Sequence, residues 1–179
     1  MNYDAVIAQL KAYAPMFNGN VAGAADYDRA VQDQVWLPPP AAYVRPLDEE
    51  AEPNTSLNSL RQLVTERFGV IVIFDNSADR RGQTVTSLYD GTRAAIWRAI
   101  LNWSVDPVRA SRGIEYGGGQ LLAHDRARLL YQWEFTLQIT VSAADGWQIT
   151  ADPLLEIDAQ LETPTGQTLA DATFILPQS

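Results

Sequence analysis

A long alternation of apolar and polar residues constrains the fold of this chain more than any other feature. Apolar side chains occupy every second position from Ala127 to Val141, and mostly polar side chains occupy the positions between them. Because successive side chains of a β-strand point to opposite faces, this pattern predicts one long antiparallel strand. One face of that strand lies in the core, and the other faces outward.

A second strand is expected directly before it. Residues 114–116 and 120–122 have strand composition, and the glycine triplet 117–119 between them predicts a bulge or a sharp bend. The short polar stretch 124–126 is typical of a hairpin turn. We therefore expect the two strands to form a hairpin.

A central strand and a long helix are predicted upstream. Within residues 61–74 the pattern changes from alternation to a continuous apolar run, which predicts a strand whose far half is buried on both faces. Apolar residues at helical spacing predict a helix within residues 85–103. Gly91 in its interior indicates close packing of the helix backbone, with contact to the sheet.

The first third of the chain predicts shorter elements. Helical spacing indicates short helices over residues 3–14 and about 24–34. Residues 42–46 predict a short strand, which Pro46 ends or places at a sheet edge. The acidic run 47–58 has no periodicity and predicts a solvated loop.

Together these elements predict an α+β fold in two layers. We expect a mixed, largely antiparallel sheet with helices packed on one face, in one domain over residues 1–144. Residues 145–179 contain short apolar segments separated by Pro153, Pro164 and Gly166. This composition predicts a C-terminal extension, as an appended arm or as additional strands.

The charge of the chain restricts its partners. The formal net charge is −9, so the surface repels phosphate backbones, and we expect no direct, sequence-specific nucleic-acid binding. No apolar run approaches the roughly 20 residues that a bilayer span requires, and the first residues lack the features of a secretion signal. We expect no membrane partner, and we expect the chain to stay in the compartment where it is translated.

The residues also restrict the chemistry. The chain has no cysteine, which excludes thiolate nucleophiles and zinc–thiolate clusters. Its only histidine, His124, lies beside Asp125 in the predicted turn, without a nucleophile or recognisable metal-ligand spacing nearby. The glycine triplet lacks the lysine and the helix N-terminus of a phosphate-binding loop. We therefore expect no catalytic residue, no metal and no cofactor, and we interpret the chain as an assembly protein rather than an enzyme.

Several side chains are candidate contacts for another protein. Arginine and tryptophan are enriched at interfaces, and two arginine pairs flank the predicted long helix, where solubility and helix-end electrostatics are the alternative roles. The outward face of the long strand carries further polar candidates. The candidate interface residues are Arg80, Arg81, Arg109, Arg112, Arg128, Glu134 and Trp147.

Four blocks of sequence resemble, in their order and spacing, the tail terminator proteins of long-tailed bacteriophages and prophages, the lambda-like tail terminator family. These blocks are residues 61–70, 95–101, 114–122 and 125–135. The resemblance covers roughly residues 1–141. Members of this family tend to end soon after the long strand. The C-terminal segment of this chain is therefore a departure from the family pattern.

The resemblance implies a structural virion protein that forms a ring, expected to be a hexamer, on the head-proximal end of the tail tube. Such a ring stops polymerisation of the tube and joins the tail to the head. The implied partners are other copies of the chain, the tail tube protein and the head–tail connector or neck proteins. The implied location is the head-proximal end of the virion tail, after assembly in the host bacterial cytoplasm.

Two alternatives remain open at this point. A neck or head-completion connector would contact the portal complex instead of the tube. A small hydrolase or ligand-binding domain would use carboxylates such as Glu115 and Glu134 in a sheet-lined pocket. Co-purification with a tube protein would distinguish a tail terminator from a neck or head-completion connector. A deep pocket with perturbed carboxylates would favour the hydrolase or ligand-binding domain.

Overall fold

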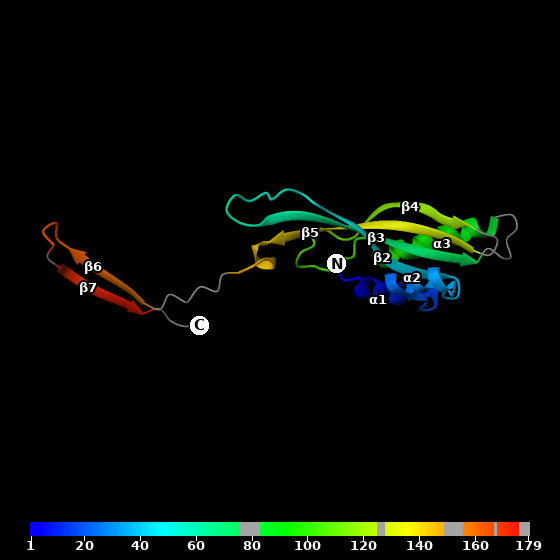
Figure 1. Cartoon of the computed structure of the whole chain (residues 1–179), viewed down its shortest axis with the longest axis horizontal. Helices are drawn as coiled ribbons and strands as arrows, with labels where there is room; N and C mark the ends of the chain where they lie inside the picture. The colour runs from blue at the N-terminus through cyan, green and yellow to red at the C-terminus, as the bar shows by residue number, and fades with distance from the viewer. Residues whose placement is uncertain (76–82, 125–127, 149–155, 167, 176–179) are drawn as a thin grey trace. The chain divides into compact units, whose positions relative to one another are not determined.

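A computed structural model describes residues 1–75, 83–124, 128–148, 156–166 and 168–175 of the 179-residue chain. The chain divides into two compact units, Met1–Gly146 and Trp147–Ser179. Figure 1 shows the helices and the larger sheet in the first unit, and a two-stranded hairpin in the second. Candidate interface residues occur in both units.

The first unit contains α-helices, short 3-10 helices and five strands. In chain order its elements are α1 Tyr3–Tyr13, η1 Pro15–Phe17, β1 Val21–Ala22, α2 Ala24–Asp33, β2 Ala41–Ala51, β3 Arg61–Asp75, α3 Gln83–Ile100, β4 Glu115–His124, β5 Arg128–Ser142 and η2 Ala143–Asp145. The strands form one sheet in the order β1-β2-β3-β5-β4. Only the β1–β2 pair is parallel, so the predicted α+β fold with a mixed, largely antiparallel sheet is confirmed.

The long alternating strand pairs with the strand predicted to be central. β3 and β5 stay in register along their whole length, from Arg61 opposite Ser142 to Asp75 opposite Arg128. Figure 1 shows the two strands side by side through the unit. Their shared buried face is apolar, and the rings of Phe68 and Phe135 stack on it with centroids 5.5 Å apart. This pairing forms the centre of the core.

Helices cover both faces of the sheet, which differs from the predicted packing on one face. α1 and α3 pack on the face that carries Phe68 and Trp133. On the opposite face, Ala30 of α2 packs against Ile71 and Ile73, which alternate with the residues of the first core. The apolar run in the C-terminal half of β3 is continuous because helices cover both faces of the sheet there.

β2 is longer than predicted. It continues through Pro46 to Ala51, so the loop predicted to begin at residue 47 begins instead after residue 51. The pairing of β2 with β3 is irregular between Pro46 and Glu49, which accommodates a proline that has no backbone N–H to donate. The acidic side chains there remain exposed, and Arg67 of the neighbouring strand contacts Asp48 and Glu50 at 3.1 Å each.

The glycine triplet forms the predicted bulge in β4. The register with β5 shifts between Tyr116 and Gly118, where the φ of Gly118 is +150°. At Gly119 a Cβ atom would lie 2.8 Å from a ring atom of Tyr131, so glycine makes room for that ring. A hydrogen bond with Tyr89, together with burial, raises the pKa of Tyr131 to about 12. β4 and β5 pair as predicted, and the turn residues 125–127 lie outside the described residues.

The second unit is a hairpin of β6 (Glu156–Glu162) and β7 (Thr168–Ile175). The strands pair antiparallel, from Glu156 opposite Ile175 to Leu161 opposite Ala170, before a shift at Glu162. No other strand or helix is described in residues 147–179. The hairpin therefore has no second layer within the described part of its own unit.

The loop after α3 is held closely against the end of that helix. The Asn102 amide donates to the Ile114 carbonyl at 2.9 Å, and the Ile114 amide donates to the Trp103 carbonyl at 3.0 Å. Gly113 lies so close to this backbone that a Cβ atom would be 2.4 Å from the carbonyl carbon of Asn102. At Gly91, in contrast, nothing lies within 4 Å of an added Cβ atom, so the predicted close packing there is wrong.

These two glycines give opposite expectations for alanine substitution. Gly113→Ala should lower the free energy of unfolding by about 1–3 kcal/mol, because rigid backbone has to move. Gly91→Ala should raise it by about 0.5–1 kcal/mol, because alanine favours a helix interior and meets only open space. Urea unfolding followed by tryptophan fluorescence measures both. Equal effects of the two variants would contradict the packing described for the loop.

Candidate functional site

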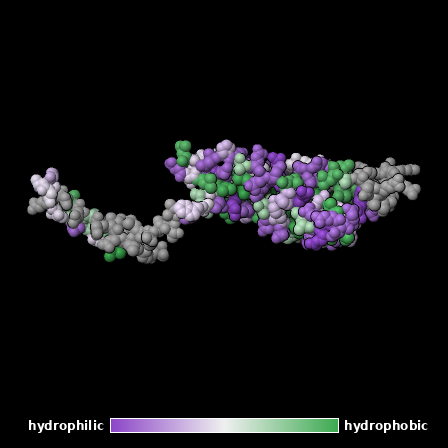
Figure 2. Space-filling model, viewed as in Figure 1, coloured by the Kyte–Doolittle hydropathy of each residue, from purple (hydrophilic) through white to green (hydrophobic). Residues whose placement is uncertain are grey.

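Three surfaces of the first unit are candidates for contact with another protein. One is a cluster of polar groups around Arg109, the second is the open polar face of the sheet, and the third is the edge strand β4. Figure 2 shows that hydrophilic and hydrophobic residues are interspersed on one side of the first unit.

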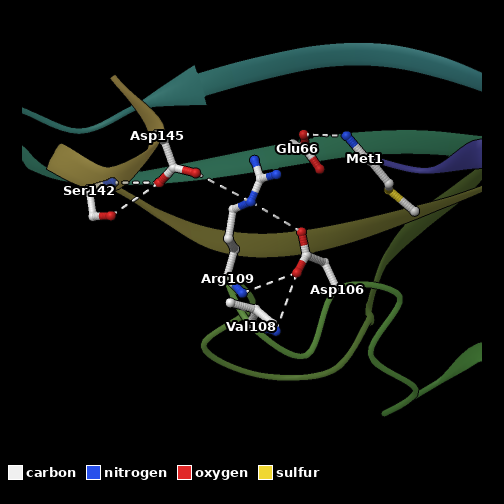
Figure 3. A network of polar contacts seen from close by, with 7 residues as sticks. All are labelled: Met1, Glu66, Asp106, Val108, Arg109, Ser142 and Asp145. Atoms are coloured by element: carbon white, nitrogen blue, oxygen red, sulfur yellow. Dashed lines mark hydrogen bonds and ion pairs between the residues drawn. The ribbon is translucent and has the colours of Figure 1, made fainter. Parts of the chain in front are cut away.

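The Arg109 cluster consists of Asp106, Arg109, Ser142 and Asp145 (Figure 3). The Asp106 carboxylate accepts hydrogen bonds from the backbone amides of Val108, at 3.2 Å, and Arg109, at 3.1 Å. The Nε of Arg109 lies 3.4 Å from Asp106 Oδ2 and 3.5 Å from Asp145 Oδ1. Arg109 thus joins the loop after α3 to the end of β5.

Backbone pairing fixes the position of this loop. The Thr140 amide donates to the Arg109 carbonyl at 2.9 Å, the Ser111 amide donates to the Gln138 carbonyl at 3.0 Å, and Ala110 forms a bridge with Ile139. The paired part of β4 begins at Glu115, so residues 109–111 take over the place of β4 along β5. Arg109 is therefore held by sheet pairing as well as by ion pairs.

Asp145 closes the cluster through a capping box. Its Oδ2 accepts a hydrogen bond from the Ser142 amide at 2.9 Å and from the Ser142 hydroxyl at 3.2 Å. The amide hydrogen bond is the main cause that lowers the pKa of Asp145, the hydroxyl and Arg109 add to it, and partial desolvation opposes them. Asp145 therefore stays ionised and available to Arg109 below its ordinary titration range.

A groove of about 630 Å³ lies beside this cluster and is called the Arg109 groove below. Its charged lining residues are Arg61 and Arg109, and no carboxylate is among the residues that line it. Val108 lines the groove with 93% of its side chain exposed, and Leu57 is 100% exposed in the β2–β3 connection. The groove lining thus combines apolar surface with two arginines, of which Arg109 is already paired with Asp106 and Asp145.

A smaller groove, of about 390 Å³, also includes Arg109 and holds a buried ion pair. The Met1 ammonium lies 2.7 Å from Glu66 Oε1, and Glu66 is buried (Figure 3). The second oxygen of this carboxylate, Oε2, is buried without a hydrogen-bond partner in the described structure. Asp106 and Glu66 give this groove a carboxylate lining that the Arg109 groove lacks.

The polar face of β5 is only partly open. Glu134 Oε1 accepts hydrogen bonds from Gln132 Nε2 at 2.9 Å and from Gln120 Nε2 at 3.0 Å. Gln132 is buried, and its side chain fills the space beside Gly69. Arg128 lies over the ring of Trp36 at 5.7 Å, so the end of β5 near α2 is already covered. Glu134 and the residues beyond it form the open part.

The remaining candidates are scattered. Arg112 forms an exposed ion pair with Glu115 at 3.0 Å. Trp147 belongs to the second unit and is 85% exposed. Arg80 and Arg81 lie outside the described residues. Of these four residues, only Arg112 lies in the described part of the first unit, and its printed ion pair is with Glu115 and not with the Arg109 cluster.

The edge strand β4 presents apolar side chains. Tyr116, Leu121 and Leu122 are all exposed, and the outer edge of β4 pairs with no other strand in the described part of the chain. An edge of this kind offers unpaired amides and carbonyls to another chain. β4 is therefore a candidate for strand addition.

A wider groove, of about 830 Å³, lies between α1, α2 and β1. Its lining contains charges of both signs: the cations are Lys11 and Arg29, and the carboxylates include Asp26 and Asp33. No group of three or more potential metal ligands occurs among the described residues. No helix in the described ranges is long and apolar enough to cross a membrane.

Sequence reasoning missed Asp106 and Asp145 as the partners of Arg109. Two local signals could have identified them: Asp106 precedes a proline, as is common where a turn begins, and Ser142-Ala-Ala-Asp145 has capping-box spacing. Gln120 and Gln132 carry no comparable signal, because their contacts to Glu134 depend on the strand register.

Comparison with known proteins gives one family. The family model described as "Phage tail terminator protein" matches residues 1–148. A chain of a solved structure titled "Virion of native gene transfer agent (GTA) particle" is 17% identical, with a TM-score of 0.47, and the match covers 76% of this chain and 92% of that chain. No curated protein sequence matches.

The capping box predicts the titration of Asp145. Its carboxyl group should titrate below the ordinary aspartate range, and Ser142→Ala should raise its pKa more than Arg109→Gln, because the hydroxyl hydrogen bond is the stronger cause. A folded pKa below the unfolded value means that this stabilisation is lost as the pH falls through the folded pKa. NMR titration of the Asp145 carboxyl group in the two variants measures which substitution raises its pKa more. A larger shift in Arg109→Gln would contradict it.

The contacts of Glu134 predict a stability difference between two substitutions. Glu134→Ala should lower the free energy of unfolding by about 1–2 kcal/mol, because the buried Gln132 amide loses its acceptor. Glu134→Gln should lower the free energy of unfolding by less, because an amide oxygen can still accept a hydrogen bond. Thr136→Ala, next along the same face, should change stability by less than about 0.5 kcal/mol. Chemical unfolding compares the three, and equal losses for alanine and glutamine would rule out this role for the carboxylate.

Proposed function

The chain belongs to the phage tail terminator family, and from this premise we propose that it forms a ring that caps the head-proximal end of a tail tube. As a member of that family it is a structural protein of the tail and a component of the virion. The observation that carries the proposal is the extent of the family match, because residues 1–148 include the whole first unit. In this role the ring stops tube polymerisation and joins the tail to the head.

We propose a hexameric ring of identical subunits. A closed ring requires two unlike patches on each subunit that meet head to tail. The β4 edge, with Leu121 and Leu122, and the Arg109 groove, with Val108, differ in composition and lie on separate elements. Each is a suitable candidate for one side of a subunit contact.

The other proposed partners are the tail tube protein on one side of the ring and the connector or neck proteins on the other. Polar contacts with these partners are supported by the open polar residues of β5, including Glu134, and by the arginine pairs. Polar contacts steer association more than they add affinity. Arg80, Arg81 and Trp147 remain proposed contacts on the same grounds. The proposed location is the head-proximal end of the tail, reached after assembly in the bacterial cytoplasm.

We propose that this role involves no catalysis. A hydrolase of the kind considered above would need Glu115 and Glu134 in a shared pocket. Glu115 is exposed and paired with Arg112, Glu134 is held by two amides, and neither carboxylate lines any of the three grooves described above. The geometry thus supports contact surfaces and not an acid–base pair.

Tube-growth assays with the cognate tail tube protein test the proposal. Electron microscopy should show rings or tubes capped at one end, and added protein should shorten the tubes in proportion to its concentration. Leu121→Lys on the β4 edge should abolish capping, whereas Tyr13→Lys, at a similarly exposed site on α1, should not. Unchanged tube length with the wild-type chain would overturn the proposal, and co-purification with portal-complex proteins instead of tube protein would favour a neck connector.

A further inference from the structure

The C-terminal hairpin has one apolar and one polar face. Its register pairs Ile157 with Phe174, Ala159 with Ala172 and Leu161 with Ala170, and all of these are apolar residues. The alternate pairs include Asp158 with Thr173 and Gln160 with Asp171. Since residues two apart along a strand lie on the same face, one face of the hairpin is continuously apolar.

This apolar face is uncovered within its own unit. Leu161 is 61% exposed and Phe174 is 58% exposed, and Ala170 and Ala172 are exposed as well. A two-stranded hairpin by itself is marginally stable in water, and it gains stability when its apolar face packs against another layer. A docking partner is therefore needed to explain a hairpin of this composition.

The charge of the C-terminal unit indicates what kind of surface that partner presents. Residues 147–179 contain no lysine or arginine, and they carry the carboxylates Asp152, Glu156, Asp158, Glu162 and Asp171. Asp158 and Asp171 belong to the alternate pairs, so the apolar face itself carries neither of them, while the unit as a whole is acidic. Such a unit fits a surface that combines exposed apolar groups with arginine and has no carboxylate in its lining.

The Arg109 groove fits this description better than the other grooves. It is lined by Arg61, Arg109 and the highly exposed Val108, without a carboxylate. The groove between α1 and α2 includes Asp26 and Asp33 among its lining residues, and the smaller groove beside Met1 includes Glu66 and Asp106. Those carboxylates would repel the acidic hairpin.

We propose that the C-terminal hairpin of each chain docks its apolar face on the Arg109 groove of a neighbouring copy. The inference rests on the proposed ring, because a hairpin and a groove on the same chain are the two unlike patches that head-to-tail closure needs. Phe174 and Leu161 then contact Val108 and Leu57, and the arginines of the groove favour the approach of an acidic unit. The hairpin acts as an exchanged arm between subunits.

The absence of cysteine makes the proposal directly testable by site-specific cross-linking. Val108→Cys and Phe174→Cys are placed in separate full-length chains, which are mixed, examined for rings by electron microscopy and treated with a bismaleimide. Docking on a neighbour holds the two thiols at high effective concentration, so the covalent pair should exceed by at least about tenfold the yield of a control mixture. In that control Tyr13→Cys, at another exposed position of the first unit, replaces Val108→Cys.

A chain that carries both cysteines identifies which groove the hairpin occupies. A ladder of linked subunits supports exchange between copies, whereas a product of monomer size shows that the hairpin docks on its own chain and overturns the inference.

The two proposals fail in different ways. Rings without cross-links overturn the exchanged arm and leave the ring intact. Cross-linked pairs without rings or capped tubes support the docking contact and count against the terminator role. Neither rings nor cross-links, in the presence of tube protein, overturn both.

Discussion

The pairing of β3 with β5 is the interaction on which the rest of the structure depends. The two strands stay in register from Arg61 opposite Ser142 to Asp75 opposite Arg128, without a bulge. Because side chains alternate between faces, this one register decides which residues of both strands enter the core with Phe68 and which face outward with Glu134. A slip by one position would exchange the two sets and expose the core residues.

The candidate assembly surfaces follow from how much of this ladder the other elements cover. α2 and Trp36 cover the outward face near Arg128, and farther along the same strand Glu134 remains on the open part. At the far end of β5, residues 109–111 continue the sheet where β4 has stopped. Figure 1 shows this end of the sheet extending past the helices, and the Arg109 groove lies there. The groove thus exists because the strands are longer than the layer that packs on them.

The two units of the chain differ in what they can do alone. The first unit buries an extensive core on both faces of its sheet, and all of it lies within the residues that the family model matches. The second unit is one hairpin with an exposed apolar face and no cation. A folded unit joined to an amphipathic arm is a common arrangement for proteins that assemble by strand or arm exchange, since the arm gains its packing only in the assembly.

Local patterns in the sequence determined the elements of this protein. The two-residue period of β5, the helical stripe of α3 and the bulge at the glycine triplet all depend on neighbours along the chain, and the order of four sequence blocks indicated the family. Only the tertiary structure decided that α2 covers the second face, that β2 continues through Pro46, and that Arg109 meets Asp145. These features depend on contacts between residues far apart in sequence, which local propensity does not specify. The surfaces proposed for assembly are made from such contacts, and for that reason the sequence indicated Arg109 but not Arg61 or the groove that the two residues line.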